Sequence, residues 1–105
     1  MAEAMRESAS WHLLRGRLHP QTRWVRDDER LFLLLPPLGV ALRFEGAAAM
    51  LLEDWLRGGD QPDALRRVGI CHGLGPTEAA DLLADQFDLV RAAGLLSPEA
   101  DPCST

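Results

Sequence analysis

The chain is 105 residues long and 47% apolar, which suits one compact domain and leaves too little chain for two. Its 16 acidic residues outnumber 11 arginines, there is no lysine, and the net charge of −5 argues against a nucleic-acid-binding protein. The first residues lack an apolar export signal and no apolar run reaches the roughly 20 residues of a membrane span, so we expect a cytoplasmic protein.

Residues 1–19 are mixed in character and are interpreted as a partly ordered N-terminal extension. Trp11, Leu14 and Leu18 lie at roughly helical spacing, but a glycine and a proline interrupt the pattern, so we expect one or two helical turns at most. Trp24 and Trp55 fall at expected core positions. Trp11 is therefore the tryptophan with a chance of being a contact residue.

The stretch from residue 22 to residue 45 predicts a three-stranded antiparallel meander. Residues 22–26 form a short strand candidate, and a charged turn separates them from the apolar strand 31–35. Two prolines and a glycine in residues 36–39 predict the second turn. Residues 40–45 alternate, which places Val40, Leu42 and Phe44 on one face.

After Gly46 the apolar period changes from 2 to 3.6, which predicts three helices. Asp60 is expected to cap a short second helix, because glycines recur from Gly69 onward and predict a loop over residues 70–75. Pro76 begins the longest helix, residues 76–93, and Gly94 ends it. The apolar stripe of the first helix consists of Ala48, Leu51, Leu52, Trp55 and Leu56.

The expected fold class is therefore α+β, a three-stranded antiparallel meander followed by three helices, similar to a winged helix-turn-helix. In that architecture the last helix would have to face phosphates and bases in DNA. Here this helix has a net charge of −3, because it contains four carboxylates and a single arginine. The partner predicted for this architecture is not DNA.

The sequence contains no convincing catalytic or metal site. Cys71 and His72 are adjacent, but zinc needs three or four ligands, and His12, His19 and Cys103 lie in unrelated segments. The acidic pairs Glu53 with Asp54 and Asp81 with Asp85 are typical of the solvated faces of amphipathic helices. We expect no enzyme activity, no cofactor and no metal.

The meander from residue 24 to residue 44, the following helix, the break at residues 58–60 and the closing residues 90–96 together resemble the PqqD-like family. These domains are recognition elements for ribosomally synthesised and post-translationally modified peptides. The resemblance covers residues 20–96 and leaves a flexible tail at residues 97–105. The short second helix and the loop at residues 70–75 depart from the family pattern, which has a fuller second helix.

The resemblance implies a non-catalytic domain that binds the leader of a precursor peptide and presents it to a tailoring enzyme, such as a radical SAM enzyme or a leader peptidase. It further implies that the leader lies as an extra strand beside the third strand, in a groove closed by the last helix. The implied peptide-binding residues are Val40, Ala41, Leu42, Arg43, Phe44, Asp81, Leu82, Asp85 and Leu89.

Alternatives remain for these residues and for the function. The apolar side chains are equally typical of plain core, and the two aspartates either select basic leader residues or only solvate the helix. The alternative function is a winged-helix-like interaction or dimerisation module without peptide cargo. An open strand edge also allows two copies to form a homodimer by pairing or exchanging strands.

Overall fold

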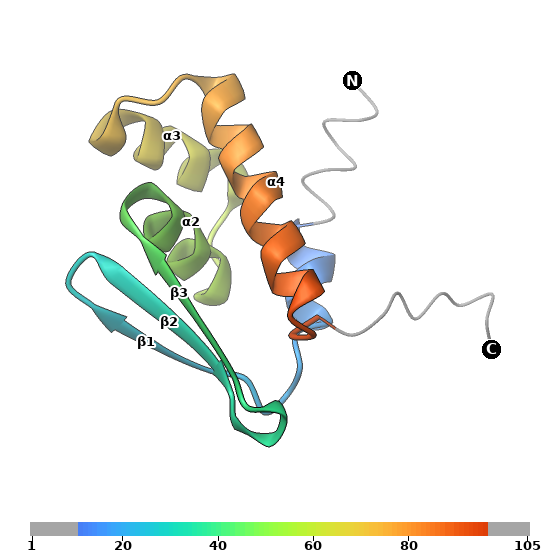
Figure 1. The fold of residues 1–105 in the computed structure, drawn as a ribbon. Coiled ribbons are helices and arrows are strands. Elements are labelled where there is room, and N and C mark those ends of the chain that lie inside the picture. Colours follow the sequence, from blue (N-terminus) through green and yellow to red (C-terminus); the bar gives the residue numbers. More distant parts are fainter. Residues whose placement is uncertain (1–10, 97–105) are drawn as a thin grey trace.

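The computed structural model describes residues 11–96, which form one sheet with helices packed against one of its faces (Figure 1). A helical segment at residues 11–16 precedes the sheet. Within residues 11–96, no helix is both long and apolar enough to span a membrane. The elements that follow are β1 (Arg23–Asp27), β2 (Arg30–Leu35), the 3-10 turn η1 (Pro36–Leu38), β3 (Val40–Glu45), α2 (Gly46–Leu56), α3 (Gln61–His72) and α4 (Pro76–Ala92).

The sheet is the predicted antiparallel meander, with strand order β1-β2-β3. Leu33 at its centre lies opposite Trp24 in β1 and Leu42 in β3. Asp28 adopts a positive φ of 59° in the turn between β1 and β2, a conformation that aspartate tolerates. Gly39 has a φ of +67° where η1 leads into β3. The predicted α+β class and the order of its elements are confirmed.

The core lies between the inner face of the sheet and the helices. The inward side chains of β2, Leu31, Leu33 and Leu35, are fully buried beneath this layer. The Trp55 ring on α2 meets Phe87 on α4 edge to face, with ring centroids 5.1 Å apart. This arrangement holds α4 alongside α2, on the helical side of the sheet (Figure 1).

Trp11 belongs to this core, so its interpretation as a contact residue is wrong. Its side chain is 1% exposed, and its ring centroid lies 6.2 Å from that of Phe87. The Trp11 indole N–H donates to the carbonyl of Gly59 at 2.8 Å, and the Trp55 indole N–H donates to the carbonyl of Trp11 at 2.8 Å. Because both indole N–H groups have hydrogen-bond acceptors, the two tryptophans can be fully buried without leaving an unpaired donor.

The second helix, α3, is longer than predicted. Asp60 caps it as expected, because its carboxylate accepts a hydrogen bond from the Asp63 N–H at 3.3 Å. The helix continues through Gly69 to His72. The prediction of a short helix is therefore wrong, and the predicted loop over residues 70–75 is wrong for residues 70–72. One glycine costs a helix only about 1 kcal/mol relative to alanine, which the surrounding packing outweighs. A second helix of 12 residues is therefore present where the sequence predicted a short one.

Gly69 has a packing reason to be inside α3. A Cβ at this position would lie 2.8 Å from the carbonyl oxygen of Leu74, where the chain turns back toward α4. Gly73, with a φ of +68°, makes that turn possible and ends the helix. The glycines that predicted a loop instead form a tight helix end.

After α4 the described chain turns back into the core, and the helix ends before Gly94 as predicted. Gly94 has a φ of +91° and ends the helix, and Leu95 and Leu96 are buried. The His19 N–H donates to the Leu95 carbonyl at 2.7 Å, so the end of the N-terminal segment is tied to this turn. The predicted flexible tail, residues 97–105, lies outside the described residues.

Candidate functional site

The outer edge of β3 is open within residues 11–96. The Gly46 N–H donates to the Glu29 carbonyl at 3.0 Å and extends the ladder between β3 and β2. Because hydrogen-bonded pairs alternate along an antiparallel ladder, this contact sets which residues of β3 bond to β2. By this alternation the backbone groups of Ala41, Arg43 and Glu45 point away from β2. Glu45 is already the N-cap of α2, so Ala41 and Arg43 are the residues that offer both their N–H and C=O groups along the open edge.

The side chains of β3 follow the predicted alternation. Val40 and Leu42 are half-buried on the helix side, and Phe44 is buried in the core. Ala41 and Arg43 are exposed on the opposite face of the sheet. Phe44 thus fits the plain-core alternative, whereas Val40 and Leu42 keep surface available beside the open edge.

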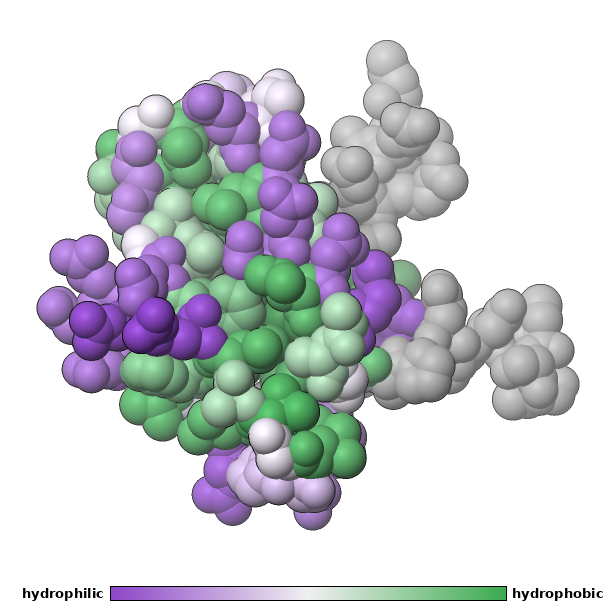
Figure 2. All heavy atoms as spheres, viewed as in Figure 1, coloured by the Kyte–Doolittle hydropathy of each residue, from purple (hydrophilic) through white to green (hydrophobic). Residues whose placement is uncertain are grey.

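A flank of α4 extends the apolar surface beyond β3. Leu82, Asp85 and Leu89 lie on this flank at helical spacing; Leu82 is half-buried and Leu89 is 54% exposed. Figure 2 shows apolar side chains gathered over β3 and the neighbouring part of α4, with polar groups along the rest of the helix. We call Val40, Leu42, Leu82 and Leu89, together with the β3 edge, the edge site.

Sequence reasoning missed Leu38, which lies at one end of this apolar surface. Leu38 is 59% exposed in the turn before β3. A Cβ on Gly94 would lie 3.7 Å from the Leu38 Cδ1 atom, so this turn approaches the end of α4. The available signal was a leucine within a Pro-Pro-Leu-Gly turn, because turn residues lie at the surface. The segment was interpreted only as a turn, so its apolar side chain was not considered.

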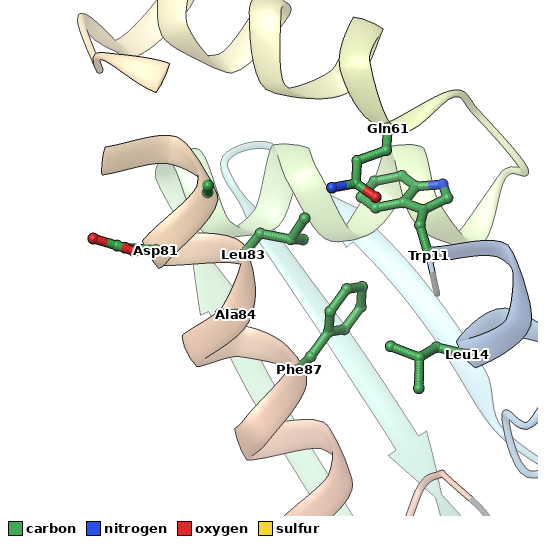
Figure 3. A pocket seen from close by; sticks show the side chains of 8 residues that line it. Trp11, Leu14, Gln61, Asp81, Leu83, Ala84 and Phe87 are labelled. Carbon is green, nitrogen blue, oxygen red and sulfur yellow. The ribbon is translucent and has the colours of Figure 1, made fainter. Parts of the chain in front are cut away.

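Asp81 lies one helical turn before Asp85, on the exposed side of α4. It lines a separate pocket of about 220 Å³ between α4, the start of α3 and the N-terminal helical segment (Figure 3). The Gln61 amide lies beside Trp11 in this pocket, and its carbonyl oxygen has no hydrogen-bond partner among the described residues. The pocket is lined by Trp11, Leu14, Gln61, Ala80, Asp81, Leu83, Ala84 and Phe87.

Side chains that could bind a metal are not clustered in the part of the chain that the structure describes. Across residues 11–96, no group of three histidine, cysteine, aspartate or glutamate side chains is placed to hold a metal ion. Cys71 and His72 are exposed in the last turn of α3. The Arg57 guanidinium lies over the ring of Trp24 on β1, with its central carbon 5.2 Å from the ring centroid. These contacts lie outside the edge site.

Asp54 is the described carboxyl with a clearly shifted pKa. Burial raises its pKa above the usual 3.8, the Arg67 guanidinium at 3.0 Å partly opposes this shift, and the neighbouring Glu53 adds to it. The pair joins α2 to α3. Asp54 is therefore a structural group of the helical layer.

Comparison with known proteins supports the fold. No family model matches the sequence, and no curated protein is significantly similar to it. Among solved structures, the chain is similar to TbiB1 in complex with the TbiA(beta) leader peptide, with a TM-score of 0.67 and 13% sequence identity. The match covers 81% of this chain and 99% of TbiB1. At this identity the likeness concerns the fold, which agrees with the predicted architecture.

Proposed function

We propose that this chain is a non-catalytic adaptor, a PqqD-like recognition element that binds the leader of a ribosomally synthesised precursor peptide by strand addition at β3. The observation that carries the proposal is the open edge of β3 beside exposed apolar residues of α4. The fold likeness supports it, because TbiB1 was solved in complex with a leader peptide. The adaptor presents the bound precursor to a tailoring enzyme, such as a radical SAM enzyme or a leader peptidase.

Main-chain pairing aligns the leader but contributes too little free energy for stable binding. Ala41 and Arg43 offer two N–H and two C=O groups, and four hydrogen bonds contribute about 2–6 kcal/mol. Ordering a flexible leader costs about 1–2 kcal/mol per residue for its backbone alone. The affinity must therefore come largely from buried apolar side chains.

The helix-side surface supplies this apolar burial. Leader residues opposite Val40 and Leu42 would point toward α4 and cover Leu82 and Leu89. Burying about 200 Å² of apolar surface contributes about 5 kcal/mol. Asp85 lies on the same flank and favours a basic leader residue next to the apolar ones. Asp81, one helical turn before Asp85 and also exposed, adds to this preference.

Titration of a fluorescently labelled cognate leader into the purified chain tests the proposal. We expect saturable binding at micromolar concentrations, with an affinity that changes little between 50 and 500 mM salt. Absence of saturable binding would reject leader recognition. If the chain instead self-associates with concentration through the β3 edge, it is a dimerisation module without peptide cargo.

A further inference from the structure

The outer face of the sheet carries apolar side chains that the described chain does not cover. Leu31, Leu33 and Leu35 of β2 point inward and are fully buried, so Phe32 and Leu34 lie on the other face. Neither Phe32 nor Leu34 packs against the core. When one face of an antiparallel sheet stays in water, its outward positions are normally polar. The central strand therefore has the composition of a strand covered on both faces.

The strand register gives the layout of this outer face. Its centre is apolar, and one end is charged. Arg43 is directly opposite Phe32, and Arg23 is directly opposite Leu34. Cover by the aliphatic stems of these arginines accounts for the half-burial of Phe32 and Leu34. Val25 is 51% exposed. Across β1, β2 and β3, the three rows are Asp27, Arg30 and Glu45; Val25, Phe32 and Arg43; and Arg23, Leu34 and Ala41.

The size of the face argues against a stable dimer of this chain. Three strands of five or six residues cover about 14 Å by about 18 Å, a footprint of about 250 Å². A stable protein interface needs about 800 Å² from each partner. The face alone is too small for a symmetric sheet-on-sheet dimer, and it needs additional surface to hold any partner firmly.

The edge site provides that additional surface. Ala41 and Arg43 belong to both features, because their peptide groups point to the open edge and their side chains lie on the outer face. Side chains of directly opposed residues in an antiparallel pair point to the same face. A leader strand beside β3 would therefore add its own alternate side chains to the outer face and widen it by about one third.

The charges of the face indicate the chemistry of its partner. Its three arginines and two carboxylates give a net charge of +1, whereas the whole chain carries −5. Glu45 forms ion pairs with two of these arginines. Its carboxylate lies 3.6 Å from the Arg30 Nε atom and 3.3 Å from the Arg43 Nε atom. A second copy of this acidic chain is disfavoured. A partner with an apolar surface bordered by carboxylates fits the face.

We propose that the peptide-modifying enzyme docks on this outer face, and that the bound leader completes the docking surface. This inference rests on the proposed adaptor function. The enzyme contacts Phe32 and Leu34 with apolar side chains and places a carboxylate near Arg43. Because the leader enlarges the surface, the enzyme binds the loaded adaptor more tightly than the empty one and so selects it.

The test uses the full chain and, as the probe, the purified enzyme that modifies the same precursor. Biolayer interferometry measures enzyme affinity for the chain with and without saturating leader. We expect at least roughly tenfold tighter binding to the loaded chain, and a loss of at least roughly tenfold in the F32T/L34T variant. Threonine keeps a high strand propensity, so this variant should fold.

Two controls separate this inference from the proposed function. Ile70→Gln removes an apolar side chain that is 78% exposed on α3, away from the sheet, and should leave enzyme binding unchanged. Leader affinity of F32T/L34T, measured by fluorescence anisotropy, should stay within about twofold of the unmodified chain, since both residues face away from the edge site. The docking proposal would be overturned if F32T/L34T bound the enzyme as tightly as the unmodified chain does. It would also be overturned if the enzyme bound the empty and the loaded chain with equal affinity. Failure of the leader itself to bind would instead reject the adaptor function, and with it this inference.

Discussion

Substitution of Ala41 by proline should block the edge site without unfolding the domain. The Ala41 N–H points away from β2, so proline at this position removes no hydrogen bond within the sheet. It removes one N–H from the leader, and its ring prevents close approach at a neighbouring bond. Losing two hydrogen bonds of about 0.5–1.5 kcal/mol each weakens leader binding by about 5- to 150-fold.

Fluorescence anisotropy with a labelled leader measures this loss, and circular dichroism confirms that the variant is folded. Leu42→Pro is the matched control, because the Leu42 N–H bonds to β2 within the ladder. That substitution should lower the unfolding midpoint markedly, whereas Ala41→Pro should leave it nearly unchanged. A folded Ala41→Pro variant that binds leader with unchanged affinity would refute the strand-addition reasoning.

Three further predictions concern the structure that supports the edge site. Trp11→Ala should cost about 3–5 kcal/mol of unfolding free energy in urea titrations, because this side chain is fully packed; an unchanged midpoint would contradict its core assignment. Gly69→Ala should destabilise the fold by about 1–3 kcal/mol, because the new Cβ collides with the Leu74 carbonyl. Its control, Gly16→Ala, meets no atom within 4 Å in a helical segment and should be neutral or stabilising. For Asp54, the raised pKa means that the folded state holds the proton more tightly than the unfolded chain, so stability is present at low pH and is lost as pH rises through that pKa. The unfolding free energy of Asp54→Asn relative to wild type should therefore increase between pH 3 and pH 7, and a constant difference would contradict the burial argument.

The parts of the fold that were predictable from sequence are those with strong periodic patterns. Alternation over residues 40–45 and the change to helical spacing after Gly46 placed β3 and α2 within one or two residues of their observed bounds. Asp60 and Gly94 were recognisable because capping and left-handed turns depend on local chemistry. These features need no knowledge of distant contacts.

The features that sequence reasoning missed depend on tertiary contacts. Trp11 is buried because Phe87, Trp55 and Gly59 surround it, and no local pattern reports neighbours 44 to 76 positions away. Gly69 was interpreted as the start of a loop. Its actual role, leaving room for the Leu74 carbonyl, is visible only in the folded chain. The pocket formed by Trp11, Gln61 and Phe87 likewise depends on where the N-terminal segment packs against α4.

Amide hydrogen exchange along β3, with and without leader, tests the central claim most directly. In the free chain the Ala41 and Arg43 amides face the open edge and should exchange rapidly, while the Leu42 and Phe44 amides are already bonded to β2. Saturating leader should slow exchange at Ala41 and Arg43 by roughly tenfold or more and change the other two much less. Saturable binding that leaves Ala41 and Arg43 unprotected would contradict leader recognition at this edge.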